Sequence, residues 1–73
     1  AKRPRVKPHV LAIDLGTSGP KVALVCLEGS LAAAAAGSVA IQRAGAAAWQ
    51  DAEAVWQSVC QAVGEVVRRA ALP

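Results

Sequence analysis

Short apolar runs alternate with turns of small residues in the first half of the chain. Apolar side chains fill both alternating sets of positions over residues ~10–15 and again over ~21–27. Such a run is typical of a strand that is covered on both faces. Residues 16–20 form a turn by composition, and residues 28–30 form a second one. The pattern therefore predicts two consecutive strands, each with two buried faces.

The next segment, residues ~31–41, contains five consecutive alanines, which favour a helix. It follows the second strand after a very short turn, however, and this spacing favours a third strand in a meander. We expect residues 42–48 to form a loop.

The last segment, residues ~51–71, shows apolar positions at helical spacing. Asp51 stands where it can cap a helix, and Glu53 lies in the first turn, where negative charge complements the helix dipole. Glu65 is placed to pair with the arginines three and four positions on, Arg68 and Arg69. The expected apolar face consists of Val55, Trp56, Val59, Cys60, Val63, Val66 and Val67.

One helix covers only one face of a sheet, whereas the first two strands are apolar on both. We therefore expect the second face to be covered, either by C-terminal chain missing from this sequence or by a self-association partner. The expected fold is α/β, with a three-stranded meander followed by one amphipathic helix over residues 10–73.

Composition limits what such a chain can do alone. It has 73 residues, of which 18 are alanine, and its only aromatic side chains are two tryptophans. A chain of this length buries only about 60% of the surface that its unfolded form exposes, so its core is small. A self-sufficient enzyme is not expected. We expect Trp49 and Trp56 to pack the helix onto the sheet, with stacking on a sugar as the alternative.

The positive charge is concentrated in residues 1–9, which we interpret as a basic flexible tail. This segment holds four of the eight basic residues and no acidic one: Lys2, Arg3, Arg5 and Lys7. The rest of the chain has a net charge of −1, so these four residues account for the net charge of +3. No aromatic side chain is interleaved with them for base stacking and no second basic patch follows, so a nucleic-acid partner is not expected. His9 is expected to be a surface residue.

No apolar run approaches the ~20 residues that a membrane-spanning helix needs, and no signal peptide is evident. We expect a cytoplasmic protein without a membrane partner. Cys26 and Cys60 are too few for a disulfide framework, and both are expected to be buried free thiols, with a bridge between them as the alternative.

Residues 12–21 hold the candidate chemistry. Asp14 lies near the end of the first strand, the small-residue turn offers backbone N–H groups and two hydroxyls, and Lys21 adds a positive charge. Oxygen ligands near Mg²⁺ and donors for phosphate oxygens are what a metal–nucleotide requires. The spacing fits neither a Walker A loop nor a dinucleotide fingerprint. The alternative is an ordinary glycine-containing hairpin with a capping aspartate.

Residues 12–27 (AIDLGTSGPKVALVCL) resemble the N-terminal phosphate-binding hairpin of the FGGY carbohydrate kinases, xylulokinase-like members especially. This family belongs to the superfamily of actin and the seventy-kilodalton heat-shock chaperones. Residues 49–56 (WQDAEAVW) resemble the E-Q-D-P-x-x-W-W segment that opens the family's first helix, although Trp49 and Ala52 depart from it. The resemblance implies a partial ribonuclease-H-like (actin-like ATPase) lobe, with residues 10–73 as part of the kinase's N-terminal domain.

The resemblance also implies roles for individual residues. Asp14 would hold Mg²⁺, acting through water, and Lys21 would contact a phosphate. The loop around the β- and γ-phosphates of ATP would consist of Gly16, Thr17, Ser18 and Gly19. The family's catalytic base, sugar site and adenosine pocket lie downstream, so this chain alone would be inactive and a sugar or polyol would bind only the full-length protein. The alternative function is a small non-enzymatic α/β protein that self-associates through its uncovered sheet face.

Overall fold

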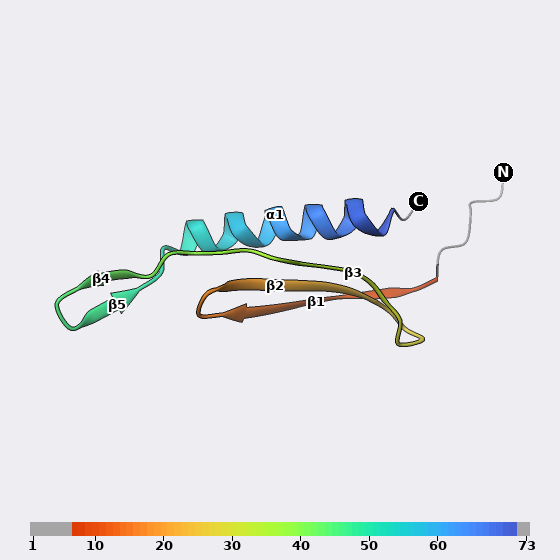
Figure 1. Ribbon diagram of the computed structural model, residues 1–73, viewed down its shortest axis with the longest axis horizontal. Helices are drawn as coiled ribbons and strands as arrows, with labels where there is room; N and C mark the ends of the chain where they lie inside the picture. Colours follow the sequence, from red (N-terminus) through yellow and green to blue (C-terminus); the bar gives the residue numbers. More distant parts are fainter. Residues whose placement is uncertain (1–6, 72–73) are drawn as a thin grey trace.

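The structure is a computed structural model that describes residues 7–71, with one antiparallel sheet, one small hairpin and one helix (Figure 1). The elements are β1 (His9–Gly16), β2 (Gly19–Cys26), β3 (Leu31–Ala36), β4 (Gln42–Ala44), β5 (Ala47–Trp49) and α1 (Ala52–Ala70). The sheet has the order β1-β2-β3, and β4 and β5 pair separately. The α/β class, with a meander followed by one helix, is therefore confirmed. Most of the expected basic tail, residues 1–6, lies outside the described residues.

Strands β1 and β2 begin and end within two residues of the predicted ranges, whereas two later segments differ more from the sequence prediction. The third strand ends at Ala36, because the chain then turns back to the first hairpin: Gly37 N–H donates to Pro20 O at 2.8 Å and Val39 N–H to Ser18 O at 3.1 Å. Part of the expected loop, residues 42–48, forms the β4–β5 hairpin, which extends beyond the end of the sheet (Figure 1). Both of its strands are exposed throughout, so no apolar alternation marks them.

Helix α1 begins and ends within one residue of the prediction. The Asp51 carboxylate accepts a hydrogen bond from Glu53 N–H at 3.3 Å, which caps the first turn. At the other end, Ala71 adopts a left-handed conformation (φ 51°), and its N–H reaches the carbonyls of Val67 and Arg68. The expected pair between Glu65 and Arg69 forms. Local signals were sufficient here because caps and charges act within one turn of the helix.

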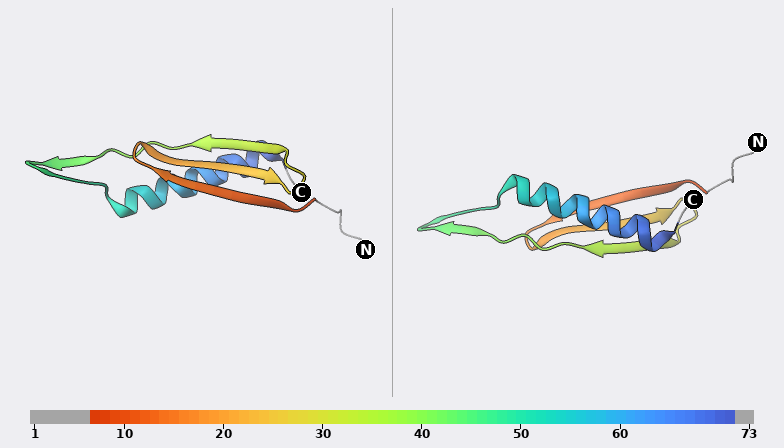
Figure 2. Two further views of the ribbon diagram at one scale, coloured as in Figure 1. Left: turned by 90° about the horizontal axis from the view of Figure 1, so that it is seen from below. Right: turned by 90° about the horizontal axis from the view of Figure 1, so that it is seen from above.

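Helix α1 covers one face of the sheet, where it packs against β2 and β3 (Figure 2). Val22 and Leu24 of β2 meet Ala62 and Val66 of α1 in a small core, against which alanines of β3 also pack. The buried positions of β2 alternate with more exposed ones, as the pleat requires. The other face of the sheet is not covered by any described residue, so burial on both faces is not observed.

Three residues of the expected apolar helix face do not lie in the core. Trp56 is 61% exposed, and Cys60 and Val67 are also exposed. The buried residues of α1 are Ser58, Val59, Ala62 and Val66, so the flank of the helix that carries Trp56, Cys60 and Val67 is turned away from the core. Trp49, on exposed β5, is not buried either. The expectation that the tryptophans pack the helix onto the sheet was therefore wrong.

Cys26 is buried and free, as expected, whereas Cys60 is free but exposed, contrary to expectation. No helix among the described residues is both long enough and apolar enough to cross a membrane.

Candidate phosphate-binding hairpin

The turn between β1 and β2 is as short as a hairpin allows. Gly16 and Gly19 are register partners, which leaves Thr17 and Ser18 as an exposed two-residue turn. Within the described chain, the backbone N–H groups of Thr17 and Ser18 donate to no other residue. The turn thus presents two backbone donors and two hydroxyl groups to solvent, which is the donor set that the sequence predicted.

Gly19 has a structural role that sequence reasoning missed. Its φ is +144°, a conformation that L side chains rarely adopt. A Cβ at this position would lie 2.3 Å from the carbonyl oxygen of Gly37. The resemblance places Gly19 in the loop around the phosphates, and in the structure the space beside its Cα is occupied by the chain's own backbone. The turn is therefore held firmly against the segment that follows β3.

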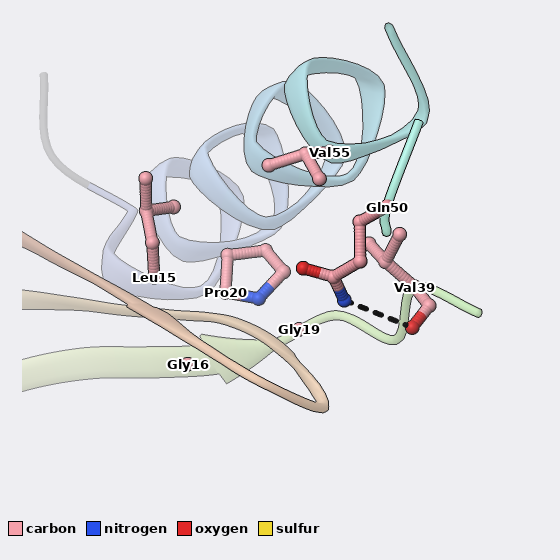
Figure 3. Close-up of a pocket in the computed structure, with 7 residues that line it drawn as sticks. All are labelled: Leu15, Gly16, Gly19, Pro20, Val39, Gln50 and Val55. Atoms are coloured by element: carbon pink, nitrogen blue, oxygen red, sulfur yellow. Dashed lines mark hydrogen bonds between the residues drawn. The ribbon is translucent and has the colours of Figure 1, made fainter. Parts of the chain in front are cut away.

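Gln50 also holds the turn in place, and it was not among the expected site residues. Its side-chain amide donates to Thr17 O at 2.8 Å. It donates more weakly to Val39 O at 3.4 Å, as Figure 3 shows. A polar residue directly before the helix cap Asp51 was the available signal, because it positions a side chain at the start of α1. A pocket of about 140 Å³ opens beside it, lined by Leu15, Gly16, Gly19, Pro20, Val39, Gln50 and Val55 (Figure 3).

Asp14 and Lys21 lie next to each other on adjacent strands, and both are exposed to solvent. They are register partners across β1 and β2, so their side chains project from the same face, two positions from the glycine pair. Both are exposed, and the two do not form an ion pair within the described part of the chain. The expectation of a carboxylate in a buried strand was wrong, because α1 covers the opposite face. Asp14 and Lys21 border an apolar hollow of about 400 Å³ on that open face.

The donor set is compatible with a metal–phosphate group and not with a metal bound by protein side chains alone. Among residues 7–71, no three His, Cys, Asp or Glu side chains gather as a metal site would require. Mg²⁺ commonly keeps several waters and takes one or two carboxylates together with phosphate oxygens. A single aspartate beside a lysine and free amides fits that mode of binding.

Trp49 borders a hollow of about 250 Å³ that Thr17, Ile41, Ala48 and Gln50 also line. The indole of Trp49 is exposed beside the turn. Stacking of Trp49 on a sugar therefore stays a prediction.

Comparisons with known proteins give no relative. No family model, no curated protein and no solved structure matches the chain. A functional proposal therefore depends on the chain's own residues and on the resemblance of its two segments.

Removing the Gln50 amide is expected to loosen the turn. In Gln50→Ala, the carbonyls of Thr17 and Val39 lose their side-chain donor, which should cost about 1–2 kcal/mol of unfolding free energy because two hydrogen bonds, one of them weak, are lost. Urea denaturation followed by circular dichroism measures the loss, and amide exchange at Val39, whose N–H donates to Ser18 O, should accelerate. Gln57→Ala is the control, since its amide contacts only Glu53 on the exposed side of α1. Equal exchange rates in both variants would contradict the assigned role.

Proposed function

We propose that this chain is the N-terminal phosphate-binding part of an ATP-dependent carbohydrate kinase. The observation that carries the proposal is the contact between Gln50 and Thr17 at 2.8 Å. Each of these residues lies in one of the two segments that resemble the kinase family, and 33 positions separate them in the chain. Two independent likenesses that meet at one turn support a shared role better than either does alone.

The chain's own residues would hold the phosphates and leave the chemistry to other parts of the protein. The backbone N–H groups and hydroxyls of Thr17 and Ser18 would donate to phosphate oxygens, and Lys21 would neutralise part of their charge. Asp14 would orient a water of bound Mg²⁺, a cation that neutralises charge on the transferred phosphoryl group. Gln50 and Gly19 act by fixing the turn, since phosphoryl transfer depends chiefly on positioning and electrostatics. The catalytic base and the sugar site would come from further chain.

Titration of the ¹⁵N-labelled chain with Mg·ATP and with Mg·tripolyphosphate tests this proposal. The largest chemical-shift changes are expected at Thr17, Ser18 and Lys21, and tripolyphosphate should reproduce them because the turn recognises phosphates. Lys21→Gln should weaken binding roughly tenfold, since a charge-assisted hydrogen bond contributes about 1.5 kcal/mol.

Lys7→Gln is the matched control. It removes the same charge, but Lys7 lies beyond the opposite end of β1 and pairs with Glu28 at 3.1 Å. Equal weakening by the two variants, or shifts spread over the whole chain, would mean that the turn is not a phosphate site.

The second candidate is a non-enzymatic α/β protein that self-associates through its uncovered sheet face. The observation in its favour is the hollow on that face, to which small side chains at Ala12, Ala23 and Ala34 contribute. This candidate predicts a dimer whose stability is indifferent to Mg·ATP.

A further inference from the structure

The turn between β1 and β2 has a backbone form that the twist of a hairpin does not favour. Its central residues, Thr17 and Ser18, lie between the register partners Gly16 and Gly19. Among the described residues, Ala71 is the one non-glycine residue with a positive φ, so both central residues have a negative φ. The turn types that suit hairpin twist, I′ and II′, need a positive φ at the first central residue, and type II needs one at the second. Type I is the form that remains.

Types I and II differ in the orientation of one peptide group. Their dihedral angles agree except for ψ of the first central residue and φ of the second, which together rotate the peptide between these residues by about half a turn. In this chain the peptide joins Thr17 C=O to Ser18 N–H. A trans peptide directs its C=O and N–H to opposite sides. One form of the turn therefore presents a donor at this point, and the other form presents an acceptor.

Gln50 is the described residue whose contact distinguishes the two forms. Its side-chain amide donates to Thr17 O at 2.8 Å from the segment between β5 and α1. With this carbonyl directed to Gln50, the Ser18 N–H points away from it, and that N–H donates to no described residue. Val39 N–H donates to Ser18 O at 3.1 Å, but this carbonyl belongs to the next peptide and keeps its place in either form. Rotation of the central peptide would thus break the contact with Gln50 and spare the contact with Val39.

We propose that Gln50 is a positioning residue that holds the Thr17–Ser18 peptide with its N–H outward, together with the resistance of Ser18 to a positive φ. When both restraints are removed, the peptide rotates and the phosphate donor becomes an acceptor. A carbonyl oxygen there would repel a phosphate oxygen, since both carry negative charge. The inference rests on the proposed function, because it concerns the donor that the turn offers to a phosphate.

Replacement of Ser18 isolates the restraint that Gln50 supplies. Ser18→Gly removes the resistance to a positive φ, so Gln50 should hold the peptide by itself. The double variant Ser18→Gly/Gln50→Met also removes the amide donor and keeps a side chain of similar length. In type I the amide protons of residues 17 and 18 approach each other, whereas in type II the Thr17 Hα approaches the amide proton of residue 18. Nuclear Overhauser contacts should show the first arrangement in Ser18→Gly and the second in the double variant.

The matched control is the pair Ser18→Ala and Ser18→Ala/Gln50→Met, which lacks the same hydroxyl but resists a positive φ. In the glycine series, Gln50→Met should weaken binding of tripolyphosphate about tenfold, because a donor to a charged group is lost. In the alanine series, the same change should weaken binding no more than about twofold, since alanine disfavours the rotated form.

Equal loss of affinity in the two series would mean that Gln50 only stiffens the chain, and it would overturn the proposal. A type II contact in Ser18→Gly, or a type I contact in the folded double variant, would overturn it too. Circular dichroism verifies folding, and Ser18→Gly with Gln50 in place gives a decisive result even if the double variant unfolds. The proton contacts are measured without phosphate. A double variant that rotates, in a chain that binds no tripolyphosphate, would support the role of Gln50 and overturn the proposed function.

Discussion

Gly19→Ala is expected to destabilise the protein by about 2–6 kcal/mol, the sum of a cost for backbone strain and a cost for steric overlap. An alanine at φ +144° is strained, and its Cβ would stand 2.3 Å from the carbonyl oxygen of Gly37. Backbone cannot move aside as a flexible side chain does, because Gly37 N–H is itself bonded to Pro20 O. Since a domain of this size has little stability to lose, the variant should be largely unfolded at room temperature. Urea denaturation followed by circular dichroism measures the effect.

Gly29→Ala separates the cost of backbone strain from the cost of steric overlap with Gly37. Gly29 also has a positive φ, +98°, but a Cβ there would meet nothing within 4 Å. This variant should therefore lose only the conformational part, about 1–3 kcal/mol. Equal losses in the two variants would mean that the contact between Gly19 and Gly37 does not constrain the turn.

Val66→Ala is expected to cost about 2–3 kcal/mol, because it removes two buried methyl groups and leaves a cavity. Val66 is fully buried between α1 and the sheet, in a core with few other large side chains. The neighbouring alanines cannot extend to fill the space. The midpoint of urea unfolding should fall accordingly.

Val67→Ala is a closely matched control for Val66→Ala. It is the next residue in the same helix and is 51% exposed. Both variants gain the same helix propensity on replacing valine with alanine, so the difference between them isolates burial. Val67→Ala should change stability by no more than about 0.5 kcal/mol. A similar loss in both variants would place α1 in a different rotation about its axis.

The sequence alone predicted the elements whose signals are local. The apolar runs over β1 and β2, the glycine-flanked turn and the cap at Asp51 each depend on residues within a few positions of one another, and the strands, the turn and the cap all appear in the structure. It placed Asp14 and Lys21 on either side of a turn over residues 16–20, and the structure, in which only two residues form the turn, makes them register partners. It missed β4 and β5, whose exposed residues carry no pattern.

The tertiary structure decided which surfaces are covered and what holds the turn. The contacts of Gly19 with Gly37 and of Gln50 with Thr17 join residues far apart in the chain, and no local pattern encodes such distances. The rotation of α1 left Trp56, Cys60 and Val67 exposed although their spacing matched the buried stripe, because the helix rests on β2 and β3 and not on β1. Periodicity shows that a helix has an apolar side, but only packing determines how much of that side meets the sheet.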